Sequence, residues 1–262
     1  MLADDDAGVD QIARVVAGDP SVAEAVLRLV NSAFIGLGRE IASVDQAIAY
    51  LGTNMLKNMV LAVQVFTGRP SASESLWIHR AQRHALLVGT IARRISADDK
   101  RTSEDAFIAG VLHDIGKLML SAGNEPAWTA MTARSRAEGR PLHEIEHEQM
   151  GLTHAEIGGY LLGRWGLPYP VIEAAANHHA PWRVQRRPGL DALTAVYVAN
   201  VLAHERARAS DADDEPFAPL AEDDLKAQRL LELLPAWREV ATQCVGASRF
   251  AQWMDGPNRR AA

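Results

Sequence analysis

Apolar residues recur along most of this chain at helical spacing rather than in the alternation typical of a strand. In SVAEAVLRLVNSAF, residues 21–34, they occupy positions 22, 26, 27, 29 and 30, and this spacing predicts a helix. Ser43 and Gln46 form a capping box at the start of the next predicted helix, which Gly52 ends. Another helix is predicted through MLKNMVLAVQVF, and the small residues at 67–74 are interpreted as a linker.

The helical periodicity continues beyond this linker. Residues 76–95 form a predicted amphipathic helix that carries His84 on the same face as Val88 and Ile91. The following helix has Ser103 as its expected cap, and its apolar stripe ends at the dipeptide His113-Asp114. Further helices are predicted at 127–138, from about 143, at 154–166, 171–179 and 191–208, with a last one near 221–234.

Small residues and prolines delimit these later elements. Gly158 and Gly159 are expected to allow close contact with another helix, and Pro181 stops the helix at 171–179. No convincing strand is found, so the predicted fold class is all-α, a helical bundle. We expect three parts: an N-terminal helical part at 1–70, a bundle at 71–208, and an acidic linker with a C-terminal helix at 209–262.

Composition and charge restrict the function. The chain has 262 residues, of which 48% are hydrophobic and 23% charged, so it can bury a substantial core. Its net charge of −6 argues against a broad nucleic-acid surface, and the basic stretch at 183–189 reads as an ordinary solvated loop. Cys244 is the only cysteine, which fits a reducing compartment. Without a signal peptide or a long apolar run, a cytoplasmic location with no membrane partner is expected.

One stretch, HEIEHEQMGLTH, contains the His-Glu-x-x-His signature of zinc peptidases at His143, Glu144 and His147. Gly151 and His154 each follow one residue too late for the long form of that motif, about 100° out of register on a helix. The chain also lacks the sheet of such peptidases. The flanking residues look solvated: Glu144, Glu146, Glu148 and Gln149. A zinc peptidase is therefore disfavoured, and His143 and His147 are expected to be exposed.

A second set of polar residues is spread over five segments: His84, His113, Asp114, His154, His178, His179 and Asn200. Any one of these histidines is more often structural than a ligand. Adjacent His-Asp and His-His pairs on helices with apolar faces favour a common site, because a buried imidazole beside a buried carboxylate needs partners. Imidazole and carboxylate suit Fe, Mn, Ni or Zn. Lys117, one turn after His113, is placed to meet phosphate.

The order His84, His113-Asp114-Ile-Gly-Lys117, His154-x-x-x-Gly158, His178-His179 resembles the HD superfamily of metal-dependent phosphohydrolases, with the paired histidines of its HD-GYP branch. The phrases LRLVNSAFIGLGREIASVDQAIAYLG, LHDIGKLML and THAEIGGYLLGRWGLPYPVIEAAANHHAP are similar to an HDOD domain, over residues 10–205. The resemblance implies an N-terminal helical part packed on an HD-like bundle. It also implies a role in bacterial signal transduction, without general enzymatic activity.

Two departures from active HD proteins bear on catalysis. The resemblance places a terminal aspartate ligand where this chain has Asn200, and a neutral amide is a weaker ligand. No GYP tripeptide follows His179. Three interpretations of the site stay open: a hydrogen-bonded network without metal, a bound metal without catalysis, and a phosphohydrolase in which Asp114 bridges ions and Lys117 steadies phosphate.

We favour a non-catalytic signalling module whose pocket supports recognition of signalling proteins or domains, with or without a divalent metal at His84, His113, Asp114, His154, His178 and His179. A minor alternative is a nucleotide-binding module that uses Lys117 with Arg183, Arg186 or Arg187. Asn200 is a candidate ligand-binding residue beside Lys117. Trp165, Tyr169 and Trp182 are interpreted as core, with a pocket or partner surface as the alternative.

Overall fold

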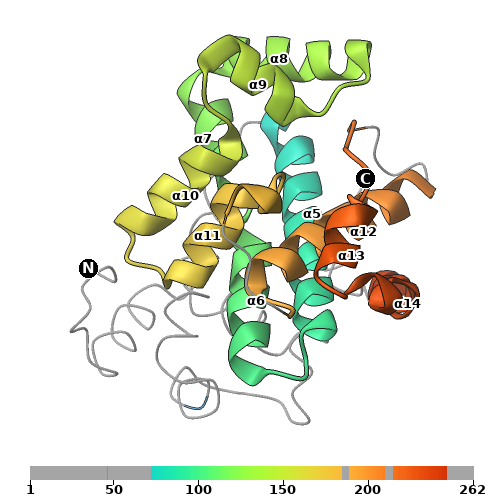
Figure 1. The fold of residues 1–262 in the computed structure, drawn as a ribbon. Helices are drawn as coiled ribbons and strands as arrows, with labels where there is room; N and C mark the ends of the chain where they lie inside the picture. Colours follow the sequence, from blue (N-terminus) through green and yellow to red (C-terminus); the bar gives the residue numbers. More distant parts are fainter. Residues whose placement is uncertain (1–45, 47–71, 185–188, 210–214, 247–262) are drawn as a thin grey trace, which may run out of the picture. The chain divides into compact units, whose positions relative to one another are not determined.

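The computed structural model describes residue 46 and residues 72–184, 189–209 and 215–246, and every regular element within these ranges is helical (Figure 1). The all-α class is thereby confirmed. Gln46 is helical, as its predicted capping box requires, while the other helices expected before residue 67 lie outside the described residues. The chain divides into two compact units, residues 84–245 and residues 1–83 with 246–262. The domain boundaries drawn from the sequence stay predictions.

The described elements follow one another with short connections. The first five are α5 (Ala72–Ile95), α6 (Lys100–Leu112), α7 (Ile115–Gly123), α8 (Glu125–Glu138) and α9 (Leu142–Met150). They are followed by α10 (His154–Arg164), α11 (Tyr169–Asn177), η1 (Pro181–Arg183), α12 (Ala192–Ala209), α13 (Glu222–Ala227), η2 (Leu231–Leu233) and α14 (Leu234–Gly246). Within the unit 84–245, α10 packs on α7 and α11, while α6 and α11 both contact α12 (Figure 1).

The core of this unit forms around α12 and α6. Every residue of α12 from Ala192 to His204 is buried, which explains a helix composed largely of alanine and valine: small side chains allow neighbouring helices to approach from all sides. Phe107 and Leu112 of α6 are fully buried. Gly110 of α6 lies against Gly89 of α5, since a Cβ on Gly110 would lie 2.6 Å from the Gly89 Cα.

The helical path breaks where the sequence places His113-Asp114. α6 ends at Leu112, Asp114 leaves helical geometry with φ −98° and ψ 12°, and α7 begins at Ile115. A close approach of α7 and α10 follows at once, because a Cβ on Gly116 would overlap the carbonyl oxygen of His154. The missing side chain therefore brings the His113-Asp114 junction against the first residue of α10.

The start of α6 differs from the sequence prediction. Asp99, not Ser103, caps the helix, since its carboxylate accepts a hydrogen bond from the Thr102 backbone nitrogen at 2.6 Å. Ser103 is buried one turn into the helix and donates its hydroxyl hydrogen to the carbonyl oxygen of Arg93 at 3.0 Å. An aspartate is as good a cap as a serine, so local sequence did not discriminate between them.

The C-terminal part also differs. A single helix was predicted near 221–234, but α13 ends at Ala227 and Arg229 adopts a positive φ of 61°. α14, which the sequence analysis did not include, begins at Leu234 with Pro235 in its first turn. Proline is tolerated there because its missing N–H would have no partner within the helix.

Lys100–Gly123 is long and apolar enough to cross a membrane by length and composition alone, with 61% of its most apolar window buried. It is interrupted at His113-Asp114, and its first part packs on α11 and α12.

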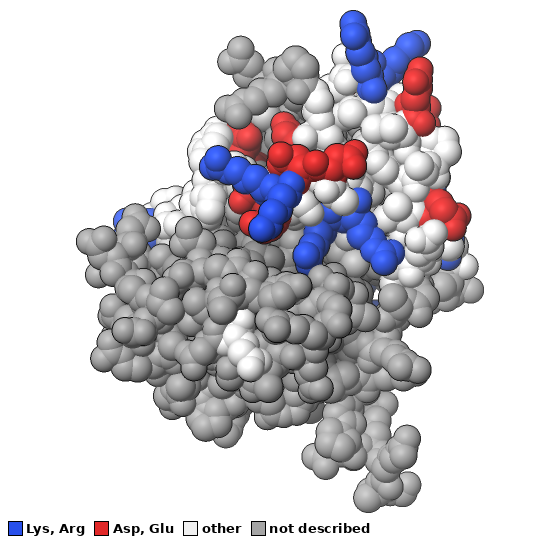
Figure 2. Space-filling model, turned by 90° about the horizontal axis from the view of Figure 1, so that it is seen from below, with Lys and Arg blue, Asp and Glu red and all other residues white. Residues whose placement is uncertain are grey.

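On the face seen in Figure 2, basic and acidic side chains of the described residues are interspersed rather than gathered by sign.

Candidate metal centre

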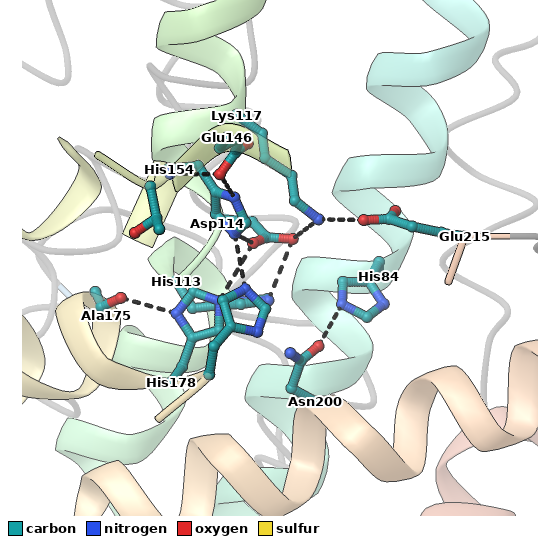
Figure 3. Close-up of polar contacts among 12 residues, drawn as sticks. His84, His113, Asp114, Lys117, Glu146, His154, Ala175, His178, Asn200 and Glu215 are labelled. Carbon is teal, nitrogen blue, oxygen red and sulfur yellow. Dashed lines mark hydrogen bonds and ion pairs between the residues drawn. The ribbon is translucent and has the colours of Figure 1, made fainter. Parts of the chain in front are cut away.

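The six side chains predicted as metal ligands come together within the unit 84–245 (Figure 3). Their positions are His84 in α5, His113 and Asp114 between α6 and α7, His154 at the start of α10, and His178 and His179 after α11. They form two overlapping groups: Asp114 with His154, His178 and His179, and Asp114 with His84 and His113. Within each group the candidate ligand atoms lie within 4.8 Å of one another, and Asp114 belongs to both.

Two of the histidines are oriented by backbone carbonyls of their own helices. His113 donates its Nδ1 hydrogen to the Gly110 carbonyl oxygen at 2.7 Å, and His178 donates its own to Ala175 at 2.8 Å. In both rings Nε2 is left as the lone-pair nitrogen. Both Nε2 atoms are buried and face oxygens of Asp114 at 3.4 and 3.5 Å, but neither makes a hydrogen bond. Burial lowers the pKa of His178 to about 3, which keeps its ring in the neutral, metal-binding form.

His154 is oriented by a buried carboxylate. Glu146 accepts hydrogen bonds from Nδ1 of His154 at 2.7 Å and from its backbone nitrogen at 2.8 Å (Figure 3). Burial lowers the pKa of His154, but the carboxylates of Glu146 and Asp114 outweigh it and raise that pKa to about 9. Nε2 of His154 lies 3.1 Å from Oδ1 of Asp114 and 2.9 Å from Nε2 of His179. A carboxylate behind a histidine is the usual support of a metal-bound imidazole.

Glu146 overturns one expectation from the sequence. It was interpreted as solvated, but it is fully buried on the inner face of α9 with Leu142 and Ile145. Leu142, Ile145 and Glu146 follow the i, i+3, i+4 pattern of one helix face, and this was the signal that could have identified it. A carboxylate at that position is stable because His154 supplies two donors.

The His-Glu-x-x-His stretch contributes in an unexpected way. Glu144 and His147 are exposed, as predicted for His147, but His143 is half-buried and stacks on His179 with ring centroids 4.0 Å apart. The expectation of an exposed His143 was therefore wrong. Burial lowers the pKa of His143 to about 4. Neither His143 nor His147 belongs to a candidate ligand group among the described residues.

Asp114 and Lys117 form a buried ion pair next to these imidazoles. Lys117 Nζ lies 2.9 Å from Oδ2 of Asp114 and 2.7 Å from Oε1 of Glu215. Burial opposes both charges, yet His113 and Lys117 hold the pKa of Asp114 well below its usual range. The two carboxylates raise the pKa of Lys117 despite its burial. Burial would raise the pKa of Glu215 as well, but Lys117 brings it down to about 2.

On the opposite side, Asn200 contacts His84. Oδ1 of Asn200 accepts a hydrogen bond from Nε2 of His84 at 2.9 Å, and the ring of His204 lies 4.4 Å from that of His84 (Figure 3 shows the hydrogen bond). Sequence reasoning missed His204, although it follows Asn200 by one helical turn and so faces the same way. It also missed Glu215, which no local pattern connects with Lys117.

The other predicted residues do not reach this centre as ligands. Arg183 is exposed, and Arg186 and Arg187 lie outside the described residues. Trp165 is half-buried, whereas Tyr169 and Trp182 are 65% and 53% exposed, so their interpretation as core was wrong. Helix α11 begins and η1 ends at the surface, which leaves both aromatic rings in solvent.

The centre has the properties of a cation site. Nε2 of His113 and Nε2 of His178 are buried without a hydrogen bond, and each such group costs about 1–3 kcal/mol. An ion bound to them would remove that cost. His154, with its pKa of about 9, carries a proton that a metal ion at Nε2 would displace. With the imidazoles in this neutral, metal-binding form, the carboxylates of Asp114, Glu146 and Glu215 exceed the ammonium of Lys117 by two negative charges. A divalent ion balances them, and the nitrogen and oxygen donors suit Mn, Fe, Ni or Zn.

Little free space adjoins the centre. The neighbouring cavity has a volume of about 30 Å³, which corresponds to roughly two water molecules. The rings of His154, His178 and His179 form one wall. Tyr197 and Val201 of α12 form another, and the chain from Glu215 to Ala218 closes a third side. These residues bound the cavity beside the centre on three sides.

Sequence comparison identifies the family. A family model described as HDOD domain matches residues 1–181, more than half of the chain. This chain belongs to the HDOD domain family. An uncharacterized protein of Treponema pallidum (strain Nichols) is 26% identical over 177 residues, which are 66% of this chain and 34% of that protein. The HDOD chain therefore spans about a third of the length of this relative.

Solved structures support the same fold. An HDOD domain protein of unknown function from Geobacter sulfurreducens matches with a TM-score of 0.64 and 20% identity, over 97% of this chain and 88% of that one. A protein from Shewanella amazonensis SB2B, proposed to be a phosphohydrolase, gives 0.64 and 21% over 97% and 88%. A proposed signal transduction protein from Marinobacter aquaeolei VT8 gives 0.66 and 21% over 97% and 57%. Asn200, His204 and Glu215 lie beyond the residues that the family model matches.

Proposed function

We propose that this HDOD protein is a bacterial, cytoplasmic signal-transduction module without turnover of its own, whose HD-like pocket holds a divalent transition-metal ion and supports recognition of a partner. One observation carries the proposal: His113, His154 and His178 each have Nδ1 engaged by a carbonyl or carboxylate oxygen, so that three Nε2 atoms converge on Asp114. Hydrogen bonding for its own sake would not leave two of these nitrogens without a partner.

The bound ion would act as a cross-link in this proposal. Its ligands come from the α6–α7 junction, the start of α10 and the end of α11. His113 and His154 are 41 residues apart along the chain, and His154 and His178 are 24 apart, so one ion would restrict the ends of four helices at once. A recognition surface built on those helices would then depend on the metal.

Three features support a role without catalysis. Asn200 stands where the HD resemblance expects a carboxylate, and its oxygen is engaged by His84. Lys117 occupies Oδ2 of Asp114, the oxygen that a second ion would need. The third feature is the cavity of about 30 Å³ beside the centre, which has no room for a phosphoester substrate while residues 215–218 line it as they do here.

Metal content per chain tests the proposal. Tag-free protein from metal-supplemented medium should contain about one Mn, Fe, Ni or Zn ion per chain by mass spectrometry. His113→Ala should lose it, while His147→Ala, which removes an exposed histidine of α9, should retain it. A wild-type chain without metal under all four supplements would instead identify the centre as a hydrogen-bonded network.

A phosphohydrolase is the second candidate, and one observation favours it. Asp114 belongs to both ligand groups, as a carboxylate that bridges two ions would. Turnover of bis(p-nitrophenyl) phosphate with any of these ions, abolished in His113→Ala, would establish this activity. The minor alternative, a nucleotide-binding module that uses Lys117 and Arg183, predicts a raised melting temperature with nucleotides.

A further inference from the structure

A short non-helical segment between α12 and α13 crosses the metal centre. We call Glu215 to Ala218 the acidic strap. Its residues line the cavity together with His154, His178 and His179. It lies outside residues 1–181, which the HDOD family model matches.

The strap is attached at two points. Glu215 places Oε1 at 2.7 Å from Nζ of Lys117, a residue 98 positions earlier in the chain (Figure 3). Two residues later, the ring of Phe217 stacks on that of His204 with centroids 5.2 Å apart and an angle of 13°. The guanidinium of Arg208 lies over the ring of Phe217, 5.6 Å from the ring centroid. Together these contacts position Glu215 at the side of the cavity.

Lys117 has the environment of an anion-binding residue. Its side chain is 8% exposed, and its ammonium lies between two carboxylates. Asp114 belongs to the candidate metal centre, whereas the Glu215 side chain is 31% exposed and contributes no ligand atom to either group. Glu215 therefore supplies to Lys117 what any oxygen anion would supply, a negatively charged acceptor at hydrogen-bonding distance.

Charge balance indicates what kind of group would replace Glu215 beside Lys117. With a divalent ion in place and Glu215 withdrawn, the ion and Lys117 exceed Asp114 and Glu146 by one positive charge. An enclosed site with an excess charge requires a counter-ion. A phosphate group fits this requirement, since its oxygens can contact the ammonium and the metal ion together.

We propose that the acidic strap is an internal competitor, in which Glu215 occupies the position at Lys117 that the phosphate of a small-molecule ligand takes when the strap is displaced. Binding of the phosphate-bearing ligand and opening of the strap are then one event, which would change the surface around α12 and α13. The inference rests on the proposed function insofar as the phosphate site adjoins the metal centre.

Calorimetric titration of the full chain with inorganic phosphate tests the competition. Glu215→Gln keeps the shape of the side chain but removes its charge, and it should bind phosphate about 10-fold more tightly than the wild type, within the usual range of coupled equilibria. Phe217→Ala releases the second attachment and should shift the affinity in the same direction. Glu232→Gln, an exposed residue of η2, is the matched control and should bind as the wild type does.

Two further measurements make the outcome decisive. Adding Lys117→Gln to Glu215→Gln should abolish the gain, because the gain requires the ammonium. Equal phosphate affinity in wild type, Glu215→Gln and Phe217→Ala would overturn the proposal and leave Glu215 as a fixed counter-ion. Metal content measured on the same samples separates the two proposals: a chain without metal refutes the metal-holding function, whereas the ratio of phosphate affinities still decides the strap.

Discussion

Glu146 holds both the ring and the backbone nitrogen of His154 while remaining fully buried in α9. Its charge matters as much as its geometry, because an anionic acceptor at Nδ1 strengthens the electron donation of Nε2 to a metal. His113 and His178 have only neutral carbonyl acceptors at the same position. At the residue scale, His154 therefore differs from the other two imidazoles in having a charged acceptor at Nδ1.

Glu146→Gln should weaken metal binding by about 10–100-fold, the usual effect of losing such a supporting carboxylate. The amide can still accept a hydrogen bond from His154, so the loss reports charge rather than collapse of the site. Competition with a chromogenic chelator measures the affinity, and Glu144→Gln, on the exposed face of α9, is the control. Equal affinities in the two variants would exclude the role of Glu146.

Asn200→Asp should strengthen binding of a divalent ion by roughly 10-fold or more, because it adds a negative charge near His84 inside an enclosed site. Asn200→Ala removes the hydrogen bond with His84 and adds no charge, so it should not strengthen binding of the ion. Competition with the same chromogenic chelator measures the affinity for the ion. A weaker affinity in Asn200→Asp than in wild type would show that the amide, with its neutral contact to His84, is the better partner.

At the scale of elements, contact between α7 and α10 sets the centre in place. Gly116 lies so close to His154 that a methyl group there would overlap the His154 carbonyl oxygen, and Gly158 faces the same contact from α10. Gly159 packs similarly on Ala176 of α11. These glycines hold Asp114, His154 and the end of α11 at ligand distance, which larger residues would prevent.

Gly116→Ala should destabilise the protein by about 1–3 kcal/mol, the usual cost of overpacking, and should also reduce metal content. Gly123→Ala, at the end of the same helix with open space around it, should be neutral or slightly stabilising. Urea denaturation followed by circular dichroism measures both. Equal stability of the two variants would mean that α7 and α10 can separate without cost.

At the scale of the unit 84–245, the centre connects several helices through their side chains. Ligands from α5, the α6–α7 junction, α10 and α11 surround one small volume. A ligand that binds only the folded state adds its binding free energy to stability. The proposed ion should thus stabilise the whole unit, not only its site.

Removal of the ion with EDTA should lower the melting temperature by roughly 5–10 °C, since metal at a hundred times its Kd contributes about 2.7 kcal/mol and each kcal/mol is worth about 2–4 °C in a chain of this size. Differential scanning fluorimetry measures the shift. His113→Ala should show no response to EDTA. An unchanged melting temperature in the wild type would contradict the cross-linking role.

The sequence by itself determined the all-α class, most of the helix positions, the HDOD family, and the histidines and aspartate that come together. These features depend on local signals: apolar spacing, prolines and glycines at helix ends, and adjacent His-Asp and His-His pairs. The misplaced cap at Ser103 and the missed α14 came from the same local rules, which do not rank Asp99 above Ser103 or distinguish a proline that starts a helix from one that stops it.

Only the tertiary structure decided which polar residues are buried and what they contact. Glu146 looks like its solvated neighbours in sequence, and Glu215 belongs to an acidic loop 98 residues from Lys117. His143 becomes a neighbour of the centre through stacking on His179, and His204 through a tilted ring contact with His84. The burial of a charged side chain depends on the partner that packs opposite it, and that partner is chosen by the fold rather than by adjacent residues.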